Sequence, residues 1–349
     1  MFGRMMNNYY YGKSGKGDFR KEDLPQNRKQ LFADTLKTRL SALCRINLLY
    51  VLIFLPAIIV TMIFYTQFLS TSSNLLMIQE NDYASYVQKV QESEGEVRIS
   101  EEDYNRIKSE GVNYTDMTDN LLFRWLIWLI PCIAITGPFT AGLSYVTRNW
   151  ARDEHAFIWT DFKDAVKENW KQSLVLSVIT SVLPVAAYVG WKYYGALAER
   201  SVVMMVPQVL VVLVGVIWAI SITYMHPMVV TYELKLKDVI RNGLLLGVAR
   251  LPWSVGIRLL HCVPVLIAGA LCYLWNPWYG MMILMAWYVL IGFSLSRFVT
   301  ASYTNAVFDR FINPRIEGAK VNQGMRKPED DEDGDEDEES DAAEGNEGD

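Results

Sequence analysis

The sequence has few of the residues on which enzymes and metal proteins usually depend. It contains 3 histidines and 4 cysteines in 349 residues, and no two cysteines form a Cys-x-x-Cys pair. This usage argues against a zinc cluster and against a disulfide framework. Walker, Gly-x-Ser-x-Gly, His-Glu-x-x-His and dinucleotide-binding motifs are also absent. We therefore expect no catalytic residue, no metal, no cofactor and no enzymatic activity.

Carboxylates are missing from the long hydrophobic runs of the chain. Six runs contain no Asp or Glu, and each is close to the roughly 20 apolar residues that a helix needs to cross a bilayer. The sequence therefore predicts an all-α polytopic membrane protein with a six-helix membrane domain over 46–300. The expected spans are 46–69, 121–145, 173–194, 202–228, 255–274 and 278–300.

Basic residues are unevenly distributed between the segments that connect these spans. Of the 33 Lys and Arg residues, 26 lie in alternate segments that share a side with the N-terminus, and 7 lie in the others. Cytoplasmic segments carry an excess of Lys and Arg. This bias predicts that both termini are cytoplasmic.

The net charge of −6 comes from one segment. Residues 329–349 hold 14 Asp or Glu and no Lys or Arg, whereas the rest of the chain holds 33 basic and 25 acidic residues. Like charges repel and few apolar groups are present, so we expect a disordered acidic tail. The other predicted segments outside the spans are a cytoplasmic N-terminal segment with an amphipathic helix (1–45), an extracellular insertion (70–120) and a cytoplasmic juxtamembrane segment (301–328).

Two stretches have sequence patterns of local structure. Ile158, Phe162, Val166 and Trp170 recur every four residues, which predicts an amphipathic helix over 153–172 on the cytoplasmic side. It could be a strut at the membrane surface or a helix that binds a partner. In the insertion, helix starts near Asp82 and Ser100 indicate a small helical hairpin, which could be a solvated insertion or a partner contact.

Small residues in the second span favour close helix packing. Gly137, Pro138, Ala141 and Gly142 would let a neighbouring helix approach the backbone. Prolines interrupt five of the six spans and would free backbone carbonyls, which suits either a kinked cavity or ordinary membrane packing. If a cavity exists, its polar lining would include Gln208, Ser221 and Thr223.

The fifth span carries the best candidates for a binding site. Arg258 and His261 are three residues apart and therefore lie on one face of a helix. Ionisable groups inside a bilayer are costly and usually mark function. An arginine there could hold an anionic headgroup or a substrate carboxylate, although interfacial anchoring would explain it equally.

Several short stretches resemble the YesL-like family of bacterial integral membrane proteins, most specifically within 137–172. The residues that carry the resemblance are Met1–Arg4, Asn47–Tyr50, Gly137–Tyr145, Arg152–Glu154, Phe162, Asn169–Gln172, Tyr303–Asn305 and Phe308-Asp309. The 70–120 insertion and the acidic tail depart from the family pattern. The resemblance implies a bacterial plasma-membrane protein with a link to carbohydrate uptake. It supplies no catalytic residue, because the family has no established activity.

Three functions remain open from the sequence. The first is a non-enzymatic accessory protein associated with carbohydrate uptake or its sensing, with membrane permease or sensor subunits as candidate partners. The second is a small-solute transporter that uses the Pro-kinked bundle. The third is a lipid-interacting membrane protein. The lipid bilayer is an expected partner in all three, and nucleic acid in none.

Overall fold

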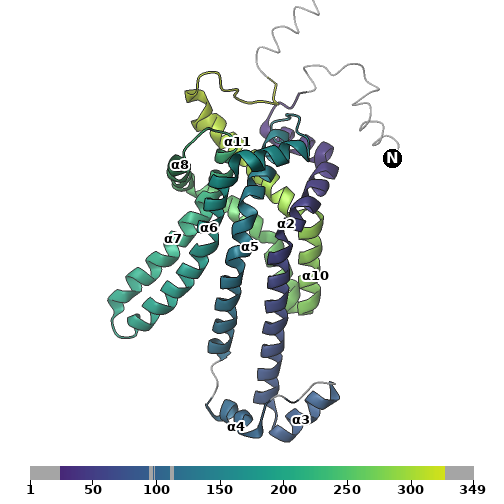
Figure 1. Cartoon of the computed structure of the whole chain (residues 1–349), viewed down its shortest axis with the longest axis vertical. Coiled ribbons are helices and arrows are strands. Elements are labelled where there is room, and N and C mark those ends of the chain that lie inside the picture. Colours follow the sequence, from purple (N-terminus) through teal and green to yellow (C-terminus); the bar gives the residue numbers. More distant parts are fainter. Residues whose placement is uncertain (1–23, 94–96, 98, 111–113, 327–349) are drawn as a thin grey trace, which may run out of the picture. The chain divides into compact units, whose positions relative to one another are not determined.

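The computed structural model describes residues 24–93, 97, 99–110 and 114–326. Every regular element in these residues is helical, which confirms the prediction of an all-α fold (Figure 1). The elements are α2 (Arg28–Glu80), α3 (Tyr83–Glu92), α4 (Glu101–Glu110), α5 (Tyr114–Trp150), α6 (Thr160–Ala198), η2 (Val202–Met204), α7 (Met205–Val229), α8 (Leu236–Ala249), α9 (Leu251–Leu274), α10 (Pro277–Trp287), the π-helical turn η3 (Tyr288–Gly292), α11 (Phe293–Phe311) and η4 (Asn313–Arg315). The acidic tail (329–349) and residues 1–23 lie outside the described residues.

Six helical runs are long and apolar enough to cross a membrane, as predicted. They are α2, α5, α6, α7 with η2, α9, and the run from α10 through η3 and α11. Their outer surfaces are apolar, and Leu52, Val209 and Leu266 are each more than half exposed. Large exposed apolar side chains on such helices suit a lipid environment. By helix length and composition, the chain is a multi-pass membrane protein.

Two helices are longer than predicted. The predicted first span and the amphipathic stretch before it form the single helix α2, which continues to Glu80. Likewise α6 contains both the amphipathic stretch and the third span, but it begins at Thr160 and not at 153. Ile158 therefore precedes the helix. A helix that starts at 153 is excluded because Asp153 has a left-handed φ of 57°, which an α-helix does not accommodate.

The described chain divides into two compact units. Unit 1 comprises Met1–Leu52, Pro138–Ser173 and Ile220–Asp349, and unit 2 comprises Ile53–Gly137 and Leu174–Ala219. Helices α2, α5, α6 and α7 each contribute a segment to both units.

Unit 2 contains a small helical module with its own core. Ile78 at the end of α2 packs with Tyr86 and Val90 of α3 and with Tyr104 of α4. The Tyr104 hydroxyl lies 2.6 Å from the carbonyl oxygen of Asn81 and 3.1 Å from that of Ile78. Both helices begin with a side-chain cap, as the sequence indicates.

The caps of the module come from short polar side chains. Asp82 accepts a hydrogen bond from the backbone N–H of Ser85 at 3.1 Å, and the Ser100 hydroxyl accepts one from the backbone N–H of Asp103 at 3.1 Å. Such caps satisfy backbone donors that would otherwise lack partners. We call residues 78–110, where described, the α3–α4 module.

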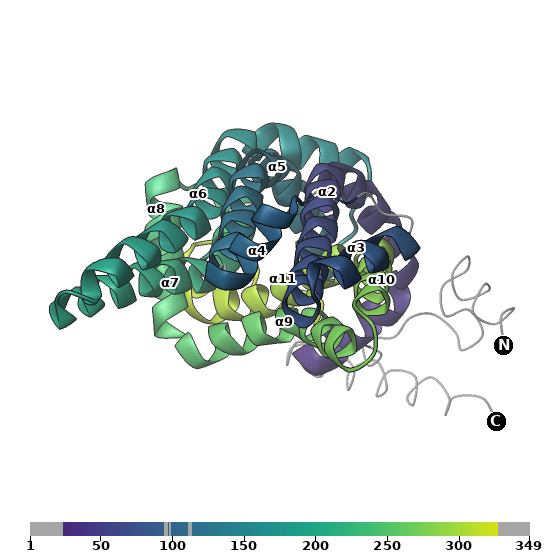
Figure 2. The ribbon, with the colours of Figure 1, turned by 90° about the horizontal axis from the view of Figure 1, so that it is seen from below.

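Unit 1 has the larger core. Its fully buried large side chains include Trp150, Tyr224, Phe298 and Phe308. Helix α8 packs closely on α7, since a Cβ atom on Gly247 would lie 2.5 Å from the Ser221 hydroxyl oxygen. Helices α9 and α10 are joined by a short turn at Asn276 and pack side by side (Figure 2). Unit 1 also contains the basic side chains of α7, α9 and α11 that form the candidate site.

Candidate functional site

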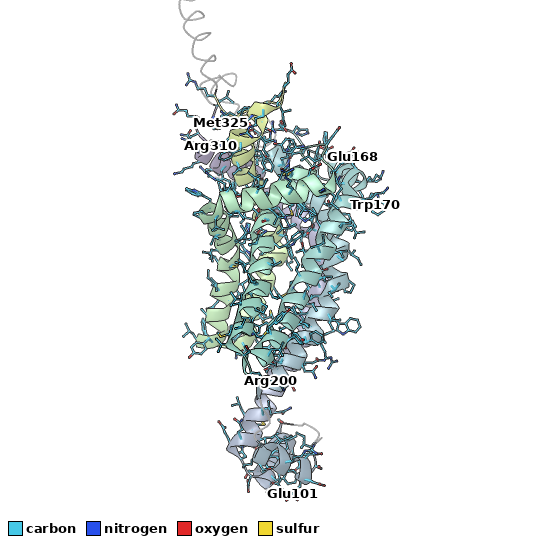
Figure 3. The ribbon with its side chains drawn as sticks, turned by 90° about the vertical axis from the view of Figure 1, so that its left-hand side faces the viewer. Glu101, Glu168, Trp170, Arg200, Arg310 and Met325 are labelled. Atoms are coloured by element: carbon cyan, nitrogen blue, oxygen red, sulfur yellow. The ribbon has the colours of Figure 1, made fainter. Side chains whose placement is uncertain are left out.

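The start of α6 packs closely against small residues of α5. A Cβ atom on Gly142 would lie 2.7 Å from Val166 Cγ2 and 2.8 Å from the Phe162 carbonyl oxygen, so only glycine allows this approach. Phe162 and Ala141 are buried. Trp170, by contrast, is 47% exposed and lies on the outside of α6 (Figure 3). The predicted apolar stripe therefore splits between a packed face and an exposed face.

The remaining small residues of the predicted packing stretch fall on the boundary between the units. Gly137 is the last residue of its unit 2 segment, and Pro138 is the first residue of its unit 1 segment. Gly137 is buried and Pro138 is half-buried.

The three polar residues predicted to line a cavity have different surroundings. Gln208 belongs to unit 2, where its side-chain amide donates to the Trp191 carbonyl at 3.2 Å. Ser221 and Thr223 belong to unit 1 and are buried. Ser221 packs against α8 at Gly247. Thr223 Oγ1 is buried and makes no hydrogen bond among the described residues.

Four basic side chains from three helices of unit 1 form what we call the basic cluster. Its members are His226 of α7, Arg258 and His261 of α9, and Arg297 of α11. Each arginine interacts electrostatically with both histidine rings, and the two arginines interact with each other. The structure thus brings Arg258 and His261 together, as predicted from their spacing, and adds a second arginine and a second histidine.

The basic cluster has no acidic counterpart in the part of the chain that the structure describes. Within the described residues, neither Arg258 nor Arg297 forms an ion pair with a carboxylate. Arg258 Nε and His226 Nδ1 are buried and have no hydrogen-bond partner there. A buried guanidinium nitrogen or imidazole nitrogen without a hydrogen-bond partner is unfavourable, and more so when the group is charged. These atoms are therefore suited to receiving an anion.

His261 is held in place by α11. Its Nε2 lies 3.1 Å from the Ser296 carbonyl oxygen and 3.5 Å from the Thr300 hydroxyl. Because the carbonyl can only accept, this contact places the proton on Nε2. His261 therefore links α9 to the residue that precedes Arg297.

A neighbouring hydroxyl network joins the same three helices. The Tyr224 hydroxyl lies 2.6 Å from the Ser254 hydroxyl and 2.8 Å from the Tyr303 hydroxyl. Ser254 also donates to the Arg250 carbonyl at 2.9 Å. These polar groups satisfy one another, which contrasts with the unpaired atoms of the basic cluster two residues along α7.

Beyond the apolar part of α11, polar residues fasten the chain that follows it. Asp309 accepts hydrogen bonds from Arg28 at 2.7 Å and from the backbone N–H of Asn322 at 3.1 Å. The Tyr232 hydroxyl donates to Asn313 at 2.6 Å, and burial raises the pKa of this tyrosine above its usual value. Asp309 and Tyr232 therefore have structural partners and are not free to bind a ligand.

Sequence reasoning missed His226 and Arg297 as site residues, because both lie near the ends of apolar runs where anchoring or capping is common. The available signal was that Arg297 is the only charged residue in 278–300. No group of three or more His, Cys, Asp or Glu side chains that could hold a metal occurs in the described ranges. The arginines of the basic cluster offer positive charge and N–H donors to an anion.

Comparisons with known proteins give one match. A family model described as "Protein of unknown function, DUF624" matches residues 117–191, which comprise most of α5 and α6. This range includes 137–172, the part of the chain with the most specific resemblance in sequence. No curated protein and no solved structure gives a match. Residues 117–191 of this multi-pass membrane protein are therefore similar to the DUF624 family, whose function is unknown.

Proposed function

We propose that this chain is a non-enzymatic protein of the bacterial plasma membrane that binds an anionic group, a phosphate or a carboxylate, at the basic cluster. The observation that carries the proposal is the pair of arginines, Arg258 and Arg297, with no carboxylate partner among the described residues. An isolated arginine near a helix end can reach the headgroups. Two mutually repelling arginines beside two histidines are better explained by an anion that neutralises them.

The position of the cluster along the chain supports this proposal. Arg258 lies in the second turn of α9, and His226 lies in the last turn of α7. With the N-terminus in the cytoplasm, as the distribution of Lys and Arg favours, both positions are near the inner leaflet. Anionic headgroups and cytosolic anions are both available at that depth.

Anion binding can be tested by ligand-induced stabilisation. In uncharged detergent, inorganic phosphate should raise the melting temperature of the wild-type protein with increasing concentration, because a ligand that binds only the folded state stabilises it. Arg258→Gln and Arg297→Gln should each weaken the apparent affinity by about tenfold or more, since a charge-assisted hydrogen bond contributes about 1.5–3 kcal/mol.

Arg241→Gln is the matched control. Arg241 is exposed on α8 in the same unit, so this variant changes the net charge equally without touching the cluster. It should keep the wild-type phosphate response. A response that is equal in all three variants and the wild type would contradict specific binding at the cluster.

A second candidate function is an accessory role in carbohydrate uptake or its sensing. The YesL-like resemblance supports it, and the α3–α4 module, which has its own core, offers a surface outside the spans for a permease or sensor subunit. Copurification of permease subunits after mild extraction would support this role. A monomer that catalyses solute uptake in liposomes would instead favour a transporter, whose usual central carboxylate is missing from these spans.

A further inference from the structure

The basic cluster adjoins an apolar groove of unit 1. The groove has a volume of about 380 Å³ and lies between α9 and the run from α10 through η3 to α11. Its wall is apolar, with Val263, Ile267, Ile283 and Trp287 among its residues, and the polar side chain of His261 lies in the lining. His261 also belongs to the basic cluster, so the groove and the cluster share this residue.

A π-helical turn forms part of the groove wall, so the shape of the groove depends on a specific backbone conformation. In η3 the backbone takes one wider turn, which leaves carbonyl groups without their usual helical partners. Asn47 of α2 supplies the partners, since its side-chain amide donates to the carbonyls of Tyr288 and Val289, each at 2.8 Å. The side-chain carbonyl oxygen of Asn47 accepts a hydrogen bond from the backbone N–H of Ser294 at 2.9 Å.

Gly292 closes this turn. A Cβ atom there would lie 2.8 Å from the Tyr288 ring and 2.9 Å from the Trp287 ring, and both aromatic residues line the groove. The glycine therefore lets the two rings pack against the backbone. Together with Asn47, it stabilises a wall that a regular α-helix would not form.

The groove opens on a surface that suits hydrocarbon. Leu260, Ile267 and Ile283 line it and are each about half exposed, at 52%, 54% and 51%. A free phosphate or carboxylate would use the basic cluster but gain nothing from such a groove. A lipid would use both, with its anionic headgroup at the arginines and an acyl chain along the apolar wall.

We infer that the anion bound at the basic cluster is the phosphate of an anionic phospholipid, with one acyl chain in the groove between α9 and the α10–η3–α11 run. The inference rests on the proposed anion binding and specifies its source. The charge of the cluster complements the headgroup, and the apolar lining of the groove complements the acyl chain. The site thus selects for an amphiphile over a water-soluble anion.

Retention of lipid by the purified protein tests this inference. The protein is reconstituted into phosphatidylcholine vesicles that contain phosphatidylglycerol, extracted into uncharged detergent, and analysed by native mass spectrometry for bound lipid. Wild-type protein should retain phosphatidylglycerol several-fold over phosphatidylcholine. Ile267→Trp fills the groove and should lower this retention about tenfold, the change that 1.4 kcal/mol produces.

Leu266→Trp is the matched control, because Leu266 is 64% exposed on the same helix and does not line the groove. It should retain phosphatidylglycerol as the wild type does. A second pair, Ile283→Trp in the groove and Met282→Trp beside it, decides the outcome if the first groove variant does not fold.

Phosphate-induced stabilisation separates this inference from the proposed function. The groove variants should keep the response to inorganic phosphate while losing lipid, whereas Arg258→Gln should lose both. If the groove variants retain phosphatidylglycerol as well as their controls do, the acyl-chain site is wrong and anion binding stands. If Arg258→Gln changes neither response, anion binding itself is wrong and the lipid inference fails with it.

Discussion

The α3–α4 module and the basic cluster are both polar features of an apolar chain, and they satisfy their polar groups in opposite ways. In the module, the Tyr104 hydroxyl has carbonyl partners and the helix starts carry side-chain caps. In the cluster, Arg258 Nε and His226 Nδ1 have no partner among the described residues. Polar groups that complete one another stabilise a fold, whereas unpaired ones in a buried setting cost stability and are suited to a ligand.

The largest loss of stability should come from removing Tyr104, the central side chain of the module. Tyr104 is 1% exposed, so Tyr104→Ala should destabilise the module by about 3–5 kcal/mol, as large aromatic truncations do. Hydrogen exchange should then become fast in α3 and α4. Tyr104→Phe, which removes only the hydroxyl, should cost about 1 kcal/mol. Unchanged protection in Tyr104→Ala would show that the module does not depend on this core.

Asn47 is a polar residue of unit 1 whose side chain, unlike Arg258 Nε and His226 Nδ1 of the basic cluster, has hydrogen-bond partners among the described residues. Its amide satisfies two carbonyls and one N–H of the π-helical region, so Asn47→Leu should leave three buried backbone groups unpaired. We expect a loss of about 2–4 kcal/mol in thermal unfolding, at roughly 1–3 kcal/mol for each group with partial relaxation. Asn47→Asp keeps the acceptor for Ser294 and should retain part of the stability. Equal stability of Asn47→Leu and wild type would contradict this role.

In the basic cluster, removing a polar side chain should change the free energy of unfolding in the opposite direction and stabilise the protein. Arg258→Met replaces a cation that has no carboxylate partner among the described residues with a shorter, unbranched apolar side chain, so it should raise the free energy of unfolding by about 1–3 kcal/mol without ligand. The same variant should lose the response to phosphate. A lower melting temperature in the absence of any anion would show that Arg258 has a structural role and would break the comparison.

Two glycines test close packing in the spans. Gly142→Ala would place a Cβ atom 2.7–2.9 Å from atoms of Phe162 and Val166, and should cost about 1–3 kcal/mol. Gly256→Ala is the matched control, because no atom lies within 4 Å of its added Cβ. It should be neutral, or stabilise by up to about 1 kcal/mol through helix propensity. Similar melting temperatures for the two variants would exclude a special packing role for Gly142.

The smallest expected effect concerns pH and the start of α3. Hydrogen bonds from Ser85 lower the pKa of Asp82, which means that the folded state prefers the ionised carboxylate. This contribution is present above the unfolded pKa and is lost as the pH falls through the lower, folded value. Asp82→Asn should therefore weaken the acid dependence of α3 protection, measured by hydrogen exchange between neutral and acidic pH. An unchanged profile would assign that dependence to another group.

Much of the architecture follows from hydrophobic runs alone, because runs of about 20 apolar residues permit few alternatives in lipid. The six spans were predictable for that reason, and the helix starts of the module were predictable from the capping residues Asp82 and Ser100. The start of α6 at Thr160 was not, because the four-residue repeat already begins at Ile158 and periodicity does not mark the residue at which a helix starts. Nor was the full basic cluster, because Arg297 and His226 come from helices far apart in sequence and only tertiary packing unites them.

The wider turn at η3 also sets the phase of everything after it. One additional residue in a helix rotates the following side chains by about 100° about the axis, since an α-helix has 3.6 residues per turn. If 278–300 were an unbroken α-helix, Arg297 would therefore lie on a different face of it. The turn at Tyr288–Gly292 thus acts as a rotational offset that points Arg297 at α7 and α9, and a single-residue deletion there would redirect the guanidinium without altering its chemistry.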